Sequence, residues 1–174
     1  MELEFWFSIG STYTYLTVMR MNEIERNHNI SLRLMPFSVR QIMLDMDNAP
    51  FPPNKASKVK YMWRDIERRA LRYKLLVPNT PVPYPLKEFD TANLVGILAA
   101  NEGWYSEYLE TTYKLWFINR LEAGSEENLM KTLSILKKDF KDLMHRSHLE
   151  ETYKIYKENT KQARKNGVFG APSF

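Results

Sequence analysis

Alternation of apolar and polar positions predicts two short strands near the start of the chain. Every second residue in 3–7 and in 30–34 is apolar, which is the period of a strand with a buried face. Gly10 ends the first run, and Ser11 or Thr12 can cap a helix that continues to about Arg26. Because strand, helix and strand follow each other, we expect a right-handed crossover and parallel pairing.

The middle of the chain is predicted to be helical. Apolar residues recur at helical spacing from Met62 to Tyr73, so residues 55–74 are expected to form an amphipathic helix. A capping box, Ser147-His-Leu-Glu150, predicts the start of a last helix that ends at Gly167. Between these two, helices are expected over 91–102, 104–121, 126–133 and 136–144. The proline-rich passages 48–54 and 77–86 are interpreted as loops.

The final stretch, VFGAPSF, is predicted to be a strand at residues 168–174. A lone strand after a helical block needs neighbours to pair with. The strands at 3–7 and 30–34 are the candidates, so the chain is expected to return to its beginning.

Composition narrows the classes of function. Hydrophobic residues make up 44% and charged residues 26% of the 174, which favours a folded domain. The chain has no cysteine, which excludes disulfides, protein thiol chemistry and thiolate metal sites. It has neither an apolar run of membrane-spanning length nor a signal-like start, so we expect a soluble, cytoplasmic protein without a membrane partner. A net charge of +4 favours anionic ligands and is too small to predict nucleic-acid binding.

The hydroxyl-rich stretch Ser11-Thr-Tyr-Thr14 is the first candidate site. A hydroxyl between a strand end and a helix start lies beside unpaired backbone N–H groups and the positive end of the helix dipole, where an anion is stabilised. The simpler interpretation is that Ser11 is an ordinary N-cap. A serine hydrolase is disfavoured because the three histidines, His28, His145 and His148, lie in polar segments.

Four motifs together resemble the 2-hydroxychromene-2-carboxylate isomerases and the kappa-class glutathione transferases, which have a DsbA-type fold within the thioredoxin-like superfamily. The motifs are FSIGSTYTYL (Phe7–Leu16; family pattern FDFxSPYSYL), Asn48 with Pro52-Pro53, Lys58 with Tyr61-Met62 and Asp65, and GVFGAPSF (Gly167–Phe174; family pattern GVFGxPTF). The chain departs from the pattern at Ser8, Gly10 and Thr12, the last of which replaces a proline.

This resemblance implies an α/β fold, a thioredoxin-like domain with a large α-helical insertion. Residues 1–40 would form its βαβ part, 41–165 the insertion, and 166–174 the return of the thioredoxin-like domain, whose final strand and helix have no counterpart in the printed sequence. It also implies a cytoplasmic homodimer that uses glutathione to isomerise an aromatic conjugated carboxylate of the 2-hydroxychromene-2-carboxylate type. The thiolate would add to a conjugated carbon, the bond would rotate, and the thiol would leave.

The resemblance assigns roles to five residues. Ser11 would stabilise the glutathione thiolate, and Ala171 and a cis Pro172 would bind the tripeptide backbone as an added strand. Lys58 and Asn48 would hold its polar ends. From the residues alone, Pro172 could equally be trans, Lys58 a surface lysine whose stem packs on the protein, and Asn48 an Asx turn.

Several alternatives remain open. The chain could be a kappa-like glutathione transferase, or a thioredoxin-like binding module that has lost catalysis. His145 and His148 could share a metal, although no third ligand is near them in sequence. Asp45 and Asp47 could pair as acid and base. The basic helix 55–74 is the best case for a nucleic-acid surface, but a solvated face with one ligand contact is the simpler account.

Overall fold

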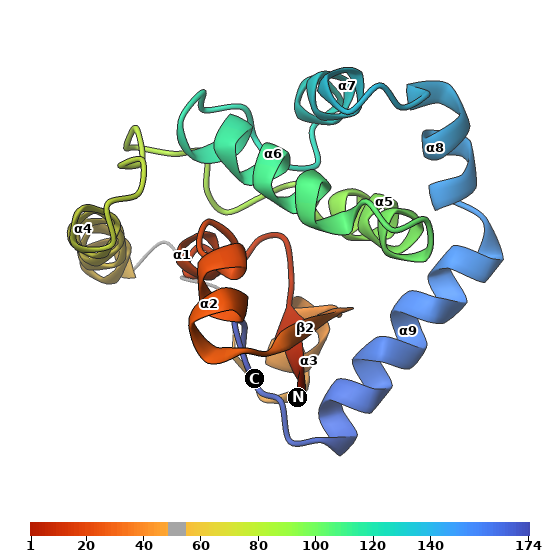
Figure 1. The fold of residues 1–174 in the computed structure, drawn as a ribbon, viewed down its shortest axis with the longest axis horizontal. Coiled ribbons are helices and arrows are strands. Elements are labelled where there is room, and N and C mark those ends of the chain that lie inside the picture. Colours follow the sequence, from red (N-terminus) through yellow and green to blue (C-terminus); the bar gives the residue numbers. More distant parts are fainter. Residues whose placement is uncertain (49–54) are drawn as a thin grey trace.

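A computed structural model describes residues 1–48 and 55–174 of the chain. Two strands and nine helices are assigned within these residues (Figure 1). They are β1 (Glu2–Phe7), α1 (Thr14–Val18), α2 (Met21–His28), β2 (Ser31–Pro36), α3 (Val39–Asp45), α4 (Ala56–Arg72), α5 (Phe89–Asn101), α6 (Tyr105–Phe117), α7 (Glu126–Ile135), α8 (Phe140–Ser147) and α9 (Glu150–Lys165).

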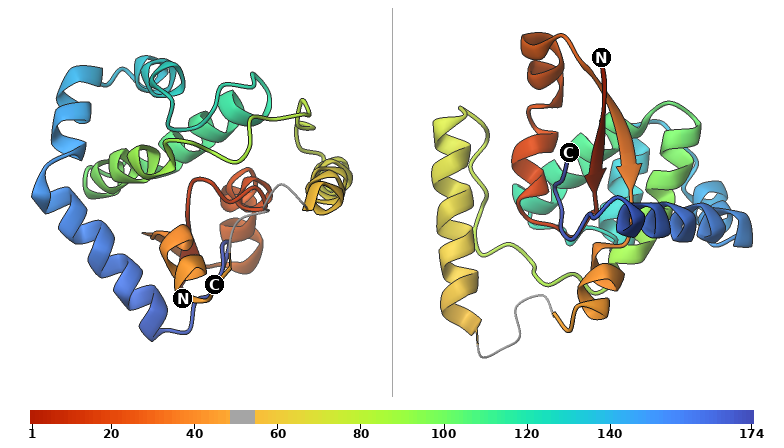
Figure 2. Two further views of the ribbon diagram at one scale, coloured as in Figure 1. Left: turned by 180° about the vertical axis from the view of Figure 1, so that it is seen from behind. Right: turned by 90° about the horizontal axis from the view of Figure 1, so that it is seen from below.

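The two strands pair in parallel, as predicted. Their register runs from Glu2 opposite Ser31 to Phe7 opposite Pro36. The last residues return to the start of the chain, where Trp6 and Ser173 exchange backbone hydrogen bonds of 2.8 and 2.9 Å in an antiparallel bridge. The return of the chain is confirmed, but residues 168–174 contribute an isolated bridge where a strand was expected. The C-terminal residues therefore lie beside β1 (Figures 1 and 2).

The helices of the middle region appear broadly where apolar periodicity predicts them, with corrections at their ends. The helix expected from Ser11 or Thr12 to Arg26 is two helices, α1 and α2, and α1 has Tyr13 as its N-cap with no side-chain cap bond. The prediction of a capping box at Ser147 was wrong, because Ser147 ends α8 and its hydroxyl donates to the Met144 carbonyl. Leu149 is the N-cap of α9.

Helix α3 was missed by the sequence interpretation. Its N-cap is Ser38, whose side chain accepts a hydrogen bond from the Gln41 backbone N–H. The α8 position was also displaced, since Asp139 caps that helix by accepting from the Asp142 N–H. Both errors come from cap residues that short-range periodicity does not reveal.

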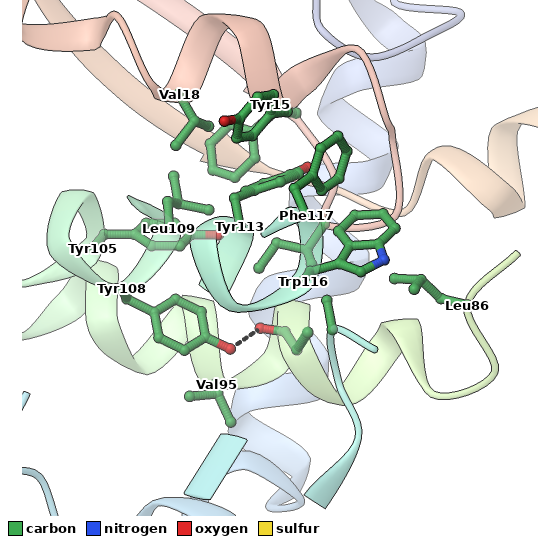
Figure 3. Close-up of a cluster of buried hydrophobic side chains, with 14 of the residues drawn as sticks. Tyr15, Val18, Leu86, Val95, Tyr105, Tyr108, Leu109, Tyr113, Trp116 and Phe117 are labelled. Atoms are coloured by element: carbon green, nitrogen blue, oxygen red, sulfur yellow. Dashed lines mark hydrogen bonds between the residues drawn. The ribbon is translucent and has the colours of Figure 1, made fainter. Parts of the chain in front are cut away.

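The core lies where α5 and α6 pack against the βαβ part, and Figure 3 shows its aromatic centre. Tyr15 of α1 stacks on Phe117 of α6 with ring centroids 4.4 Å apart. The buried Tyr108 donates to the Ala92 carbonyl at 2.8 Å, which ties α6 to α5. Figure 2 shows α4 and α9 at opposite edges of the molecule. No helix in the described residues has the length and apolarity needed to cross a membrane.

Candidate functional site: a cationic pocket at Ser11 and Ala171

A pocket of about 460 Å³ lies where five segments of the chain meet. The segments are the loop before α1, α3 with Asn48, the first turns of α4, residues 84–86, and residues 169–171. Its described lining residues are Gly10, Ser11, Thr12, Tyr13, Val39, Arg40, Met43, Asn48, Lys55, Lys58, Met62, Tyr84, Pro85, Leu86, Phe169, Gly170 and Ala171. Four of the five predicted site residues are among them, and the fifth, Pro172, follows directly.

Ser11 and Ala171 are in direct contact at this pocket. The Ser11 hydroxyl donates to the Ala171 carbonyl with an Oγ–O distance of 2.6 Å, although 160 positions separate the two residues. The Ala171–Pro172 peptide bond is cis, as predicted. Ser11 therefore does not cap a helix, and the simpler interpretation of its hydroxyl was wrong.

Two buried side chains hold the loop that carries Ser11. Asn93 of α5 accepts from the Ile9 N–H at 2.8 Å and donates to the Ile9 carbonyl at 3.0 Å. Tyr113 of α6 donates to the Ser11 carbonyl at 2.9 Å, and burial raises the pKa of its phenol. Sequence reasoning missed both residues. An asparagine inside the apolar run of α5 was the available signal, because a buried amide needs hydrogen-bond partners.

Two side chains of the same loop connect it to α4. The Tyr13 hydroxyl donates to Asp65 at 3.0 Å, and burial followed by this hydrogen bond raises the pKa of Tyr13 to about 12. The Arg69 guanidinium, 2.8 Å from the same carboxylate, holds the pKa of Asp65 below its usual value. The Thr12 hydroxyl donates to the Met62 sulfur at 3.0 Å. These bonds fix the pocket wall formed by α4.

The pocket is positively charged. Its described lining residues include Arg40, Lys55 and Lys58, and none of them is acidic. Lys55 is the N-cap of α4 and Lys58 lies in its first turn, so both oppose the helix dipole. No described carboxylate forms an ion pair with either lysine. Such an arrangement is unfavourable without an anion and therefore favours an anionic ligand.

Asn48 lines the pocket after the end of α3, with its backbone N–H bonded to the Met43 carbonyl at 2.8 Å. The accompanying motif residues Pro52 and Pro53 lie outside the described residues. Lys58 is exposed and close enough to the same pocket to contact a bound molecule.

The competing candidate sites are not assembled within residues 1–48 and 55–174. The three histidines are exposed, and the described residues contain no group of three side chains able to hold a metal ion. Asp45 forms an ion pair with Arg164 of α9. Hydrogen bonds from Gln41 and from Arg164 hold the pKa of the Asp45 carboxyl below its usual value. This pairing accounts for Asp45 as a structural contact between α3 and α9.

A family model described as a DSBA-like thioredoxin domain matches residues 2–174. The chain belongs to this family. The thioredoxin-like fold with a helical insertion is therefore confirmed. No curated protein sequence matches the chain.

Two solved structures illustrate the fold of the family. A 2-hydroxychromene-2-carboxylate isomerase is 20% identical with a TM-score of 0.81, and the match covers 99% of this chain and 83% of that one. The cytosolic disulfide reductase DsbM from Pseudomonas aeruginosa with GSH is 12% identical with a TM-score of 0.66, over 99% and 84% of the two chains. At these identities the likeness extends to the fold alone. This chain has no cysteine with which to exchange disulfides.

Proposed function

We propose that this protein binds glutathione in the cationic pocket and uses its thiolate to isomerise an aromatic conjugated carboxylate of the 2-hydroxychromene-2-carboxylate type. The observation that carries the proposal is the 2.6 Å contact between the Ser11 hydroxyl and the Ala171 carbonyl at the edge of a pocket with three cationic residues. Two fold neighbours support it, one named as that isomerase and one described with GSH.

The residues present fit glutathione. Lys58 and Lys55 face the pocket with no described carboxylate partner, and the tripeptide carries two carboxylates. The backbone of residues 170–171 reaches the pocket wall, where it can pair with an extended peptide as an added strand does. Asn48 supplies an amide that can donate and accept at the far end of the peptide.

Ser11 and Ala171 are hydrogen-bonded to each other in the structure. We infer that each exchanges this partner for an atom of the peptide when the peptide binds. The Ala171 carbonyl then accepts a backbone N–H of the peptide, and the Ser11 hydroxyl turns to donate to the sulfur. A hydrogen bond to the charged form lowers the pKa of the thiol, and each pKa unit corresponds to about 1.4 kcal/mol. Ser11 thus acts as a stabiliser of the thiolate and not as a nucleophile.

Bound glutathione supplies a thiolate that adds to a conjugated carbon, converts the double bond into a rotatable single bond and leaves again, so that the tripeptide is regenerated and nothing is oxidised. The protein contributes position and electrostatics. Asn93 and Tyr113 hold the Ser11 loop from behind, which keeps the hydroxyl in place during the reaction. The apolar part of the wall, formed by Val39, Met43 and Met62, excludes water around an aromatic ring.

The test compares the wild-type protein with Ser11→Ala in the glutathione-dependent isomerisation of 2-hydroxychromene-2-carboxylate. We expect Ser11→Ala to lower kcat/KM by about 10- to 100-fold, because a hydrogen bond to a charged group is lost. We also expect the pKa of the thiol of bound glutathione to rise. Thiolate absorbance, recorded at a series of pH values, measures this pKa. Ser134→Ala, an exposed serine of α7, is the matched control.

Other results would contradict the proposal in distinct ways. Absence of saturable glutathione binding at millimolar concentration would exclude every glutathione-dependent reaction. A product that retains the tripeptide would identify a kappa-like glutathione transferase. Saturable binding without turnover would identify a binding module that has lost catalysis.

A further inference from the structure

Phe169 is an apolar residue of the pocket that the site assignment above does not use. It lines the pocket, and 74% of its surface is exposed. Other large apolar side chains are exposed elsewhere on the chain, but among the described residues Phe169 alone of this group lines the pocket. Scattered exposed apolar residues are ordinary, whereas an exposed ring in a cavity of ligand size indicates a surface that a ligand covers.

The backbone on both sides of Phe169 is fixed. Before it, the Val168 N–H donates to the Ala163 carbonyl of α9 at 2.9 Å, and the Val168 side chain packs against a buried cluster. After it, the Gly170 carbonyl accepts from the Ser173 hydroxyl at 2.9 Å. The exposed ring therefore belongs to an anchored segment, which holds it at the pocket.

Open space lies next to this segment. A Cβ placed on Gly170 would have no heavy atom within 4 Å apart from those of its chain neighbours. No aromatic ring of the described residues stacks on Phe169, in contrast to Phe174, whose ring lies on that of Phe5 with centroids 4.9 Å apart. The Phe169 ring is therefore accessible to the ring of a bound molecule.

Phe169 is also close to the point where the proposed thiolate is held. It precedes Ala171 by two residues, which span at most about 7 Å of backbone. The Ala171 carbonyl is in turn 2.6 Å from the Ser11 hydroxyl oxygen. Val39 of α3 lines the same pocket and packs against the same buried cluster as Val168, so that α3 adds apolar surface on this side. A ring conjugated with the carbon that the thiolate attacks is brought to this part of the pocket.

An aromatic ligand suits a phenylalanine surface. Two aromatic rings attract each other in offset or edge-on arrangements with centroids about 4.5–7 Å apart, and their contact removes apolar area from water. An aliphatic acid offers less apolar area and lacks the ring interaction. Resting on the proposed function, we infer that the aromatic ring of the substrate packs on Phe169, and that this contact makes the pocket selective for aromatic over aliphatic conjugated acids.

Equilibrium binding tests this inference without turnover. Cinnamate and sorbate are both conjugated monocarboxylates, and only cinnamate has a ring. Each is titrated into the protein with and without saturating S-methylglutathione, whose sulfur is blocked, and affinity is measured by calorimetry. The wild type should bind cinnamate more tightly than sorbate. Phe169→Leu should weaken cinnamate binding by about 3- to 10-fold, because an aromatic pair is lost, and should leave sorbate binding within about twofold of the wild type. Phe169→Trp should keep the preference for cinnamate.

Two controls separate a ring contact from damage to the pocket. Phe169→Leu should bind S-methylglutathione as the wild type does, because the tripeptide is proposed to bind through other residues. Tyr153→Leu is the matched substitution, in an exposed aromatic residue of α9 outside the pocket lining. It should bind both acids with the affinity of the wild type.

Three results would overturn the inference. Equal weakening of cinnamate and sorbate binding by Phe169→Leu would indicate a general effect on the pocket. Equal affinity of the wild type for the two acids would show that the pocket does not select for a ring. Unchanged cinnamate affinity in Phe169→Leu would exclude the contact, and a simultaneous change of oligomeric state in sedimentation would assign the ring to an interface between copies of the chain.

The failure of this inference and the failure of the proposed function are distinguishable. If the wild type does not isomerise 2-hydroxychromene-2-carboxylate with glutathione but prefers cinnamate through Phe169, the reaction is wrong and the ring site stands. If it isomerises the substrate and Phe169→Leu alters neither cinnamate affinity nor KM, the reaction stands and Phe169 has no part in substrate recognition.

Discussion

At the scale of single residues, the position of Ser11 depends on side chains far from it in sequence. Asn93 makes two hydrogen bonds to the backbone of Ile9, and Tyr113 makes one to the backbone of Ser11. Ile9 is buried, and an unpaired backbone group inside the protein is costly. The amide of Asn93 therefore substitutes for the strand pairing that ends before Ile9.

We predict that Asn93→Ala destabilises the protein by about 2–4 kcal/mol, because it leaves both polar groups of Ile9 without these partners. Urea unfolding followed by circular dichroism measures the change. Asn101→Ala, at the exposed end of the same helix, is the control and should have little effect. If both variants unfold at the same urea concentration, Asn93 does not hold the loop.

At the scale of elements, α4 is attached to the βαβ part through the residues that line the pocket. Tyr13 bonds to Asp65, and Thr12 bonds to Met62 one turn earlier on the same face of α4. Trp63 adds ring contacts to Phe117 of α6, with centroids 5.5 Å apart. Contacts at the pocket wall thus connect α4 both to the Ser11 loop and to α6.

The Asp65 contacts predict a pH-dependent stability. The Arg69 hydrogen bond lowers the pKa of Asp65 in the folded protein, so its contribution is complete above the ordinary Asp pKa of about 3.9 and is lost as the pH falls through the lower folded value. Asp65→Asn should cost about 1 kcal/mol at pH 7, because a partly exposed charged pair is lost. The difference from wild type should shrink as the pH falls below the ordinary Asp pKa of about 3.9.

Urea unfolding of both proteins at several pH values measures this prediction. Asp47→Asn provides a control, since Asp47 is exposed and its positive φ of 52° is one that asparagine also accepts. A constant difference between Asp65→Asn and wild type over the whole pH range would show that the Asp65 charge does not support the attachment of α4.

At the scale of the whole molecule, the pocket joins segments from both ends and the middle of the chain. Residues 10–13 and 169–171 meet beside α3, α4 and residues 84–86. A ligand that contacts all of them binds only the folded state. Binding should therefore stabilise the entire fold.

We predict that glutathione raises the melting temperature, with a stabilisation of about 2.7 kcal/mol at a hundred times its Kd. Added NaCl should reduce the gain because it screens the exposed lysines. Lys58→Gln should weaken the gain, whereas Lys60→Gln, an exposed lysine of the same helix outside the pocket lining, should not. Thermal unfolding at fixed glutathione concentrations is the measurement. Equal loss in both variants would exclude a specific contact with Lys58.

Much of the fold could be predicted from the sequence because its signals are local. The apolar alternation at 3–7 and 30–34 gives the parallel strands, and helical spacing gives α4. The four family motifs predict five site residues, and four of the five line one pocket. Helix ends were less predictable. Ser11 and Ser147 each resemble an N-cap in sequence, but their hydroxyls donate to the carbonyls of Ala171 and Met144.

The sequence by itself determined the two parallel strands, most of the helices that follow them, the absence of protein thiol chemistry and the residues that match the family motifs. Only the tertiary structure decided that Ser11 bonds to Ala171, that Asn93 and Tyr113 hold the Ser11 loop, and that Arg40 shares the pocket with Lys58. The physical reason is the sequence separation between the residues in contact. Periodicity and caps report forces between residues a few positions apart, whereas these contacts join residues as far as 160 positions apart and form only once the helices pack around a common core.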